Sequence, residues 1–283
     1  HRQPVFIREY LWPQKRRRKV KRKIKGIVFD IDGCVALGNK AIPGVPDTMA
    51  ELRRRNIRFA FLTNDNQNTR QFLAEKLTNM GIPAHEDEVL TSAIIAARTV
   101  RELHPKSKIL AFGGPGLMEA LGEQNLDLLN HEQFMDAEVV VMGKDPNFCQ
   151  QSLILASKAI WNGADFIATN YDPKIPVADG FVPATGPFIK AVAYATGKEP
   201  LVTGKPSKWS GEMAMKVLDV PPENGAVVGD RLQQDIAMGK VAGLLTVLVL
   251  TGGTTPEEAE NPPEDLKPDL VLPDVNHLLE YLD

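Results

Sequence analysis

The sequence predicts an α/β protein built around a parallel β-sheet. Short apolar runs alternate with helical patterns from Ile24 onward, which is typical of repeated βαβ units. The 283-residue chain is 43% apolar and 24% charged, as expected of a globular protein. Four of the apolar runs end in polar residues, and open α/β sheets bind ligands beyond the carboxyl ends of their strands. Those four strand ends are therefore the place to look for function.

The elements follow one another regularly along the chain. Apolar runs without alternation predict strands that are buried on both faces, at 24–29, 58–62, 108–112, 138–142, 165–168, 201–202, 226–228, 246–250 and 270–272. Apolar residues at helical spacing predict helices near 47–55, 68–80, 92–103, 116–122, 147–161, 187–196, 209–218, 233–241 and 275–282. The proline-rich segment 256–268 predicts a surface helical turn and a loop.

The net charge of −3 hides a basic N-terminal segment. Eight of the nine residues in KRRRKVKRK, 15–23, are basic, and such a block repels itself and does not pack. One interpretation is a tail that binds nucleic acid or an anionic membrane, or that directs targeting. The other, which we favour, is a solvated leader over 1–23. Contact of this tail with nucleic acid is therefore not our leading expectation.

Composition argues against several other classes of protein. No apolar run is long enough to span a membrane, and no apolar segment of a secretory signal follows the basic N-terminus. Cys34 and Cys149 are too few for a disulfide framework. The five histidines lack the spacing of a zinc site. These features predict a cytoplasmic protein without a histidine-based metal centre.

The first strand ends in FDIDG, 29–33, which places two carboxylates two residues apart. If Asp30 and Asp32 point the same way and both are ionised about 4 Å apart, they repel by about 4 kcal/mol at an effective dielectric near 20. A cation, a proton on one carboxylate, or a turn that separates them would offset this cost. A metal-held Asp can act as a nucleophile, and a protonated neighbour can donate to a leaving group.

The other three strand ends supply complementary groups. FLTND contains Thr63 and Asn64, whose hydroxyl and amide suit phosphoryl oxygens, and VTGKP contains the positive charge of Lys205. VVGDRLQQD contains Asp230, which could complete a Mg²⁺ site of oxygen ligands, and Asp235, which could bond Lys205 or the metal shell. We expect all four ends to lie on one edge of one sheet.

Each motif also has a purely structural interpretation, such as a turn, a helix start or a helix N-cap. Their joint occurrence at strand ends favours a single site. Rival motifs fail: Glu199 stands where a P-loop needs its first Gly, and Pro206 replaces the hydroxyl residue. No G-x-S-x-G elbow is present either.

Together these motifs resemble the haloacid dehalogenase (HAD) superfamily of aspartate-based phosphatases. FDIDGCV is similar to its first motif, FLTND to the second, GKP to the third and VVGDRLQQD to the fourth, and the likeness spans roughly 24–283. Further segments are similar to the subfamily with a large α/β cap between motifs two and three, at 90–100, 163–172, 179–192 and 248–258. That subfamily includes 4-nitrophenylphosphatase-like, phosphoglycolate, pyridoxal-phosphate and ribonucleotide phosphatases.

The resemblance implies a Rossmann-like core at 24–100 and 200–283, with a C2-type cap inserted at 101–199. Within the cap, 169–172 and 183–186 are expected to face the substrate. The resemblance further implies that Asp30 attacks phosphorus and forms an aspartyl-phosphate, while Asp32 is the general acid and base. Mg²⁺ would be held by Asp30, by the main-chain carbonyl of Asp32 and by Asp230. The phosphoryl oxygens would be bound by residues of the second and third motifs, namely Thr63, Asn64, Asp65 and Lys205. Asp235 would support them.

Two residues depart from the family pattern. Cys34 stands where Thr or Val is usual, and we expect a packing role for it. Asp65 stands where relatives often have Asn, so it would either weaken phosphate binding or serve as a helix N-cap, which we favour.

We therefore expect a Mg²⁺-dependent phosphatase acting on small phosphomonoesters, and a homodimer formed through the cap is compatible with this. The alternatives are a phosphotransferase or mutase that passes the phosphoryl group to a sugar, and a phosphate-binding protein with a nucleic-acid-binding tail.

Overall fold

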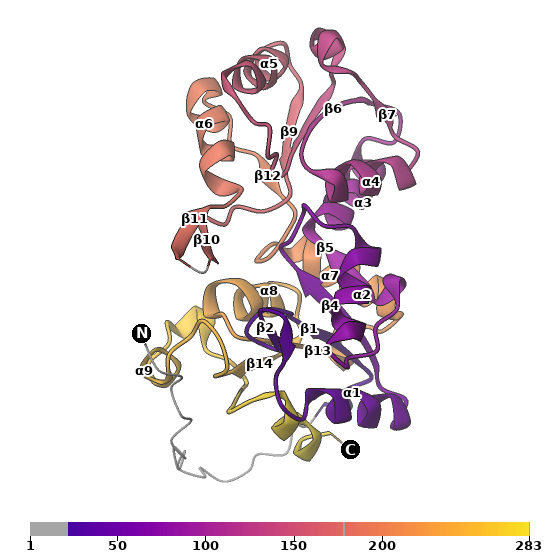
Figure 1. The fold of residues 1–283 in the computed structure, drawn as a ribbon, viewed down its shortest axis with the longest axis vertical. Helices are drawn as coiled ribbons and strands as arrows, with labels where there is room; N and C mark the ends of the chain where they lie inside the picture. The colour runs from indigo at the N-terminus through magenta and orange to yellow at the C-terminus, as the bar shows by residue number, and fades with distance from the viewer. Residues whose placement is uncertain (1–21, 178, 283) are drawn as a thin grey trace.

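A computed structural model describes residues 22–177 and 179–282 of the chain. Its long strands form two sheets in two lobes, one above the other in Figure 1. The lower, six-stranded sheet has the order β15-β14-β13-β1-β4-β5, and the upper, five-stranded sheet has the order β12-β9-β8-β6-β7. Every pairing within both sheets is parallel, so the predicted α/β class is confirmed. No described helix is long and apolar enough to cross a membrane.

The six-stranded sheet brings three of the predicted motifs together. Its strands are β1 (Gly26–Phe29), β4 (Arg58–Thr63), β5 (Val89–Thr91), β13 (Gly225–Gly229), β14 (Leu245–Val249) and β15 (Leu270–Leu272). In register, Phe29 of β1 lies beside Val228 of β13 on one side and Phe61 of β4 on the other. The carboxyl ends of these three strands therefore meet at one edge, where the first, second and fourth motifs begin.

The third motif comes from the other sheet. That sheet contains β6 (Lys108–Phe112), β7 (Asp127–Leu128), β8 (Val139–Met142), β9 (Asp165–Ala168) and β12 (Leu201–Val202). Leu201 pairs with Ile167, and the N–H of Thr203 extends the pairing by donating to Ala168 O at 3.0 Å. The expectation that all four strand ends share one sheet is therefore wrong. Strand β12 has only two residues, which is too short for the sequence to indicate which sheet it joins.

Helices cover both faces of both sheets, as parallel sheets require. They are α1 (Val45–Arg54), α2 (Arg70–Asn79), α3 (Ser92–Leu103), α4 (Pro115–Glu123), α5 (Gln150–Trp161), α6 (Gly186–Thr196), α7 (Lys208–Leu218), α8 (Ala237–Val241) and α9 (Pro256–Glu260). On the six-stranded sheet, α1 and α2 pack on one face, and α3 and α7 pack on the other. In the upper lobe, α5 and α6 cover the outer face of the five-stranded sheet (Figure 1).

The two lobes share one apolar core. Val28 of β1 and Val141 of β8 belong to the same cluster of buried residues, which also includes Ile94 and Ile95 of α3. Because α3 contributes to the core of both sheets, it joins the lobes by packing and not only by covalent connection. The division into core and cap at 100 and 199 stays a prediction, and the upper sheet extends to Val202.

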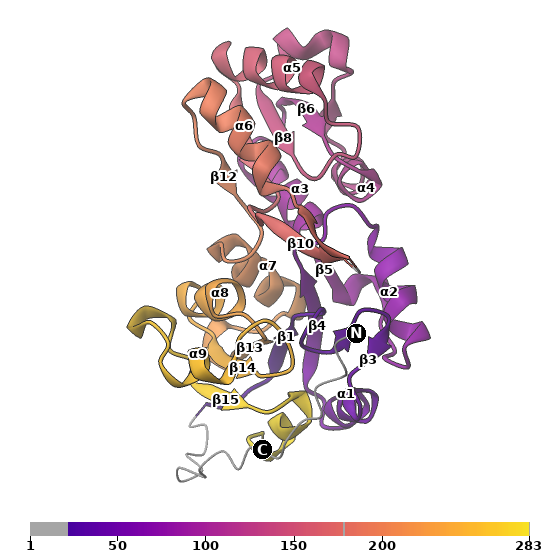
Figure 2. The same cartoon turned by 60° about the vertical axis from the view of Figure 1, so that its left-hand side comes forward.

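Several elements differ from the sequence-based expectation. Strands β5 and β7 and two antiparallel hairpins were not predicted. The hairpins are β2 (Ala36–Leu37) with β3 (Lys40–Ala41), and β10 (Lys174–Val177) with β11 (Gly180–Pro183). The predicted helix at 233–241 begins as a π-helical turn, Leu232–Ile236, and 275–282 is instead a 3₁₀ helix, Val275–Glu280. Figure 2 shows β10 between the two lobes, close to the edge where the motifs meet.

Candidate active site

The loop after β1 separates the two carboxylates of the first motif. The N–H of Asp30 still donates to Val228 O at 2.9 Å, as a strand residue would. The chain then turns through Gly33, which has φ +93°, and a Cβ there would lie 2.8 Å from Cγ of Asp230. The Asp30 side chain is only 12% exposed, whereas Asp32 is exposed. The two acids therefore occupy different environments, which suits different chemical roles.

Lys205 lies between two acids. Its Nζ contacts Oδ1 of Asp30 and lies 2.7 Å from Oδ1 of Asp235. The Lys205 and Asp235 side chains are 2% and 1% exposed. Burial opposes the charge of the amine, but Asp235 and Asp30 outweigh it and raise the pKa of Lys205 above its ordinary value. Lys205 is therefore a cation, and the predicted bond between Asp235 and Lys205 is confirmed.

Asn64 fixes the main chain of Lys205. Its Oδ1 accepts from the N–H of Lys205 at 2.9 Å, and its Nδ2 donates to the carbonyl of Lys205 at 3.1 Å. A Cβ on Gly204 would lie 2.8 Å from the same Oδ1, so this close approach requires glycine. The amide that we expected to bind phosphoryl oxygens is thus engaged in holding the lysine.

Asp172 of the upper lobe supports Asn64. Its Oδ2 accepts from Nδ2 of Asn64 at 2.9 Å and from Nδ2 of Asn170 at 2.6 Å, and its Oδ1 accepts from Gln234. Sequence reasoning placed 169–172 at the substrate face but assigned no partner to it. Asn64 lies 108 residues away, so no local pattern reveals this contact.

Asp65 closes the loop that follows β4. Its Oδ1 accepts from the N–H groups of Gln67 at 2.8 Å and Asn68 at 3.2 Å, and its own N–H donates to Thr63 Oγ1 at 3.0 Å. The expectation that Asp65 is a helix N-cap is wrong, because Thr69 caps α2. A role of Asp65 in binding phosphate stays a prediction.

Asp230 has an unpaired carboxylate oxygen. Its Oδ2 accepts from the N–H of Gly253, whereas its Oδ1 is buried with no hydrogen-bond partner among the described residues. Carboxylate oxygens of Asp30, Asp230 and Asp235 all lie within 4.8 Å of one another. A buried anionic oxygen without a partner is costly, so this set of donors fits a hard divalent cation such as Mg²⁺. The carboxylate of Asp32 is not in this cluster.

Burial also raises the pKa values of the acids in this cluster. It raises the pKa of Asp30 to about 6, although Lys205 opposes the shift. Burial and then Asp235 raise the pKa of Asp230. Asp235 is bonded to Lys205 and to the N–H of Arg231 at 3.1 Å. Both oxygens of Asp235 are thus engaged, whereas Asp30, bonded to Lys205 through Oδ1, and Asp230 each keep one oxygen without a hydrogen bond among the described residues. Asp30 and Asp230 are therefore the better candidates for holding a cation.

The turn after β14 was missed as part of the site. Thr251 Oγ1 donates to the carbonyl of Gly33, and Gly253 holds Asp230. A Cβ on Gly252 would overlap the Asp230 carboxylate. The sequence signal was the Thr-Gly-Gly run directly after the predicted strand 246–250. Cys34, by contrast, is buried in the core with its Sγ 3.4 Å from Val228 O, so its predicted packing role is confirmed.

A cavity of about 680 Å³ unites these groups at the junction of the lobes. Seven of the eight predicted site residues line it, namely Asp30, Asp32, Thr63, Asn64, Asp65, Lys205 and Asp230. Asp235 is not a lining residue but contacts Lys205. From the upper lobe the lining includes Asn170, Asp172, Ala184 and Thr185, within the two segments expected to face the substrate.

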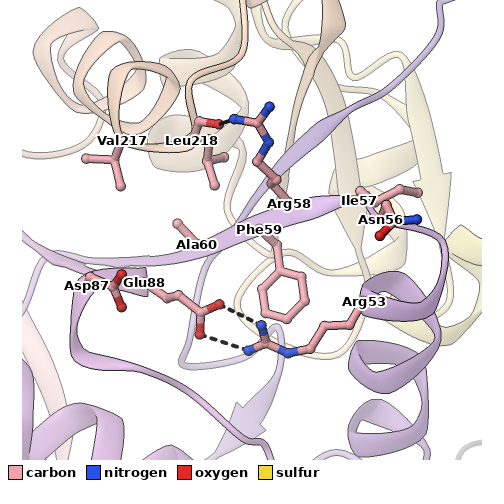
Figure 3. A pocket seen from close by; sticks show the side chains of 10 residues that line it. All are labelled: Arg53, Asn56, Ile57, Arg58, Phe59, Ala60, Asp87, Glu88, Val217 and Leu218. Atoms are coloured by element: carbon pink, nitrogen blue, oxygen red, sulfur yellow. Dashed lines mark hydrogen bonds and ion pairs between the residues drawn. The ribbon is translucent and has the colours of Figure 1, made fainter.

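A second cavity, of about 540 Å³, lies near the start of β4 and contains none of the predicted site residues (Figure 3). Its two arginines already have partners: Arg53 makes two bonds of 2.8 Å to Glu88, and Arg58 donates to Leu218 O at 2.6 Å. The cavity at the lobe junction is therefore the candidate active site.

Comparison with known proteins places this site in a family. An acid sugar phosphatase from Staphylococcus saprophyticus is 35% identical over 259 residues, which are 92% of this chain and 98% of that protein. The chain belongs to the haloacid dehalogenase-like hydrolases. The model for haloacid dehalogenase-like hydrolases matches residues 27–127, and a HAD-hydrolase-like model matches residues 202–278.

Solved structures of these hydrolases share the fold over nearly the whole chain. The p-nitrophenyl phosphatase from Archaeoglobus fulgidus has a TM-score of 0.85 and 33% identity, and the match covers 92% of this chain and all of that one. NagD from E. coli K-12 has a TM-score of 0.83 and 28% identity, over 90% of this chain and 98% of that one. The predicted membership of the HAD phosphatases, with a Rossmann-like parallel core and a cap, is therefore confirmed.

Proposed function

We propose that this hydrolase is a Mg²⁺-dependent phosphatase that cleaves small phosphomonoesters through a covalent intermediate on Asp30. The main support is the ion pair between Asp30 and Lys205 beside the unpaired oxygen of Asp230. The names of its relatives, an acid sugar phosphatase and a p-nitrophenyl phosphatase, agree with a small substrate.

In the first step, a carboxylate oxygen of Asp30 attacks phosphorus, and the bond from phosphorus to the ester oxygen breaks. Asp32, exposed and lining the same cavity, gives its proton to the departing alkoxide. Lys205, fully buried and charged, lies where it neutralises phosphoryl oxygens next to Asp30. The products of this step are the free alcohol and an aspartyl-phosphate.

In the second step, Asp32 takes a proton from water, whose oxygen attacks phosphorus and releases inorganic phosphate from Asp30. The hydroxyl of Thr63 lines the cavity and remains able to donate to a phosphoryl oxygen, because its contact with Asp65 uses it as an acceptor. Asn64 contributes indirectly by holding Lys205.

Mg²⁺ would be held by Asp30, Asp230 and the main-chain carbonyl of Asp32. When bound, the ion supplies positive charge that offsets the charges of the phosphoryl group and of the clustered acids. The upper lobe over 101–199 would act as the cap that limits water and selects the leaving group. A homodimer formed through this cap, and a cytoplasmic location, stay predictions. Of the basic segment 15–23, residues 15–21 lie outside the described residues.

The test is a panel of phosphomonoesters assayed for released phosphate, with Mg²⁺ and after treatment with EDTA. We expect the protein to hydrolyse p-nitrophenyl phosphate and other small phosphate esters. EDTA should abolish this activity, and added Mg²⁺ should restore it. The assay is repeated in the presence of a sugar, and both free phosphate and phosphorylated sugar are quantified. A phosphatase yields free phosphate, whereas a mutase or transferase would yield phosphorylated sugar. Activity that survives exhaustive chelation would contradict the proposed Mg²⁺ requirement.

A further inference from the structure

Three basic side chains line the catalytic cavity in addition to Lys205. They are Lys144, Lys174 and Arg231. Among the described residues none of the three forms an ion pair, whereas Lys205 is paired with both Asp30 and Asp235. Beside the five acids of the lining, the cavity therefore has three basic side chains beyond the lysine that lies next to Asp30.

Lys144 is fixed in position by both lobes. It follows β8, its N–H donates to Asn66 Oδ1 of the lower lobe at 2.7 Å, and its carbonyl accepts from the N–H of Gly114 at 3.0 Å. Asn66 is itself 3% exposed, so a buried side chain holds the main chain of Lys144. Lys144 is half-buried, and its amine has no ion pair among the described residues. An anion bound in the cavity could therefore pair with Lys144.

Arg231 enters the cavity from the lower lobe. It follows Asp230 and is half-buried, and a Cβ on Gly253 would lie 3.3 Å from its Cγ and Nε. The side chain therefore lies along the turn that holds Asp230. A guanidinium group binds carboxylates and phosphates through two parallel hydrogen bonds. Lys174 of β10 is more exposed, with its Nζ 4.2 Å from the centre of the Phe181 ring.

Among the described residues, no acid of the cavity forms an ion pair with Lys144 or Arg231, although Asp230 attracts Arg231 electrostatically. Asp65 is bonded to Gln67 and Asn68 of its own loop, and Asp172 accepts from three side-chain amides. Asp30 is paired with Lys205. The positive charges of Lys144 and Arg231 therefore remain available to a ligand.

The cavity also lacks a surface for stacking a base. None of its described lining residues is aromatic, and its apolar lining is limited to Leu37, Ile175 and Ala184. Proteins that bind nucleobases commonly stack them on aromatic rings. The volume of about 680 Å³ nevertheless leaves room for a leaving group next to the phosphoryl site.

We infer that the preferred substrate has a second anionic group on its leaving side, a carboxylate or a second phosphate, bound by Lys144 and Arg231. This inference rests on the proposed phosphatase function and narrows its substrate class. Small phosphorylated acids and bisphosphates are then better substrates than uncharged sugar phosphates or nucleoside monophosphates of comparable reactivity.

The test uses matched substrate pairs in which one member has a second anionic group and the other has a neutral hydroxyl in its place. One pair is 3-phosphoglycerate and glycerol 3-phosphate, and the other is propane-1,3-diol bisphosphate and its monophosphate. We expect kcat/KM to favour the doubly anionic member of at least one pair by about tenfold or more, as one charge-assisted hydrogen bond allows. The pair that shows the preference identifies the second group as carboxylate or phosphate.

Variants then assign the preference to residues. Lys144→Gln and Arg231→Gln should each reduce the ratio of kcat/KM values within the responsive pair by about tenfold, and Lys144→Arg should largely restore it. Lys106→Gln removes an exposed lysine outside the cavity and serves as the matched control. Thermal unfolding of each variant shows whether it is folded. The ratio of kcat/KM values within a pair does not depend on the fraction of active enzyme, because both substrates are assayed with the same preparation.

Equal kcat/KM values within both pairs, or ratios unchanged in Lys144→Gln and Arg231→Gln, would overturn the inference while leaving the phosphatase proposal intact. Failure of the wild-type protein to release phosphate from any of these esters and from p-nitrophenyl phosphate would instead reject the proposed function itself.

Discussion

Lys205 and Asp30 form a buried ion pair although they follow strands of different sheets and are 175 residues apart. Asp30 extends β1 of the lower lobe, and Lys205 comes three residues after β12 of the upper lobe. The site is therefore assembled at the junction of the lobes. Residues that fix this junction should influence catalysis even where they do not touch the substrate.

Asn64→Ala tests the positioning of Lys205. Loss of two hydrogen bonds to the main chain of Lys205 should let its amine shift, and small misplacements of catalytic groups cost on the order of 10²-fold in rate. We expect kcat for p-nitrophenyl phosphate to fall by about that factor while KM changes little. A large rise in KM at constant kcat would show that Asn64 instead binds substrate. Asn79→Ala, an exposed residue at the end of α2, is the control.

Asp235→Asn tests the second partner of Lys205. The substitution removes a carboxylate that is 1% exposed and leaves the buried amine with Asp30 alone. Breaking a buried ion pair from one side costs about 3 kcal/mol or more, which denaturant unfolding would measure. Asp219→Asn removes an acid that is 91% exposed and pairs with Arg58, so it should change stability by less than about 1 kcal/mol. Equal effects of the two variants would contradict the importance of burial at Lys205.

Asp230→Asn tests the cation site. A neutral amide in place of the unpaired carboxylate removes one of two acids assigned to Mg²⁺. We expect the Mg²⁺ affinity, measured by titration calorimetry, to fall at least tenfold, in line with losses at metal sites. Unchanged affinity would place the ion elsewhere.

Asp269→Asn should reduce stability in a pH-dependent way. The Asp269 side chain is 43% exposed. Partial burial would raise its pKa, but its Oδ2 accepts from the N–H and hydroxyl of Thr246 at 2.8 and 2.7 Å, and these bonds lower the pKa. Because the folded-state pKa is lowered, this stabilisation is complete above the ordinary value of 3.8 and disappears as pH falls through the lowered value. We expect the variant to lose about 1 kcal/mol near neutral pH, allowing for solvent exposure, and to approach the wild type as pH falls below the lowered pKa of Asp269. A difference that is independent of pH would contradict this assignment.

Most of the regular fold was predictable because strong local patterns agree with the tertiary structure. All nine predicted strands are present, from β1 to β15. Strand β5 was missed because Val89–Thr91 runs directly into the apolar helix α3, with no turn residue to divide them. The β10–β11 hairpin was missed because prolines at 176 and 183 argue against strands.

The sequence predicted most of the residues that line the site, but not the hydrogen bonds that hold them in place. The strand-end motifs correctly indicated that Asp30, Lys205 and Asp230 meet, because parallel strands place their carboxyl ends together. The bonds from Asn64 to Lys205 and Asp172 depend on how two lobes pack, and no spacing within one segment contains that information. For the same reason the sequence could not show that Lys144 and Arg231 line one cavity.

The most direct test of the catalytic assignment is the turnover number of Asp30→Asn with p-nitrophenyl phosphate and saturating Mg²⁺. Removal of a nucleophile predicts a loss of roughly a thousandfold or more, in a protein whose circular dichroism and thermal unfolding show a native fold. A folded Asp30→Asn protein that retains turnover within about tenfold of the wild type would contradict covalent catalysis by Asp30.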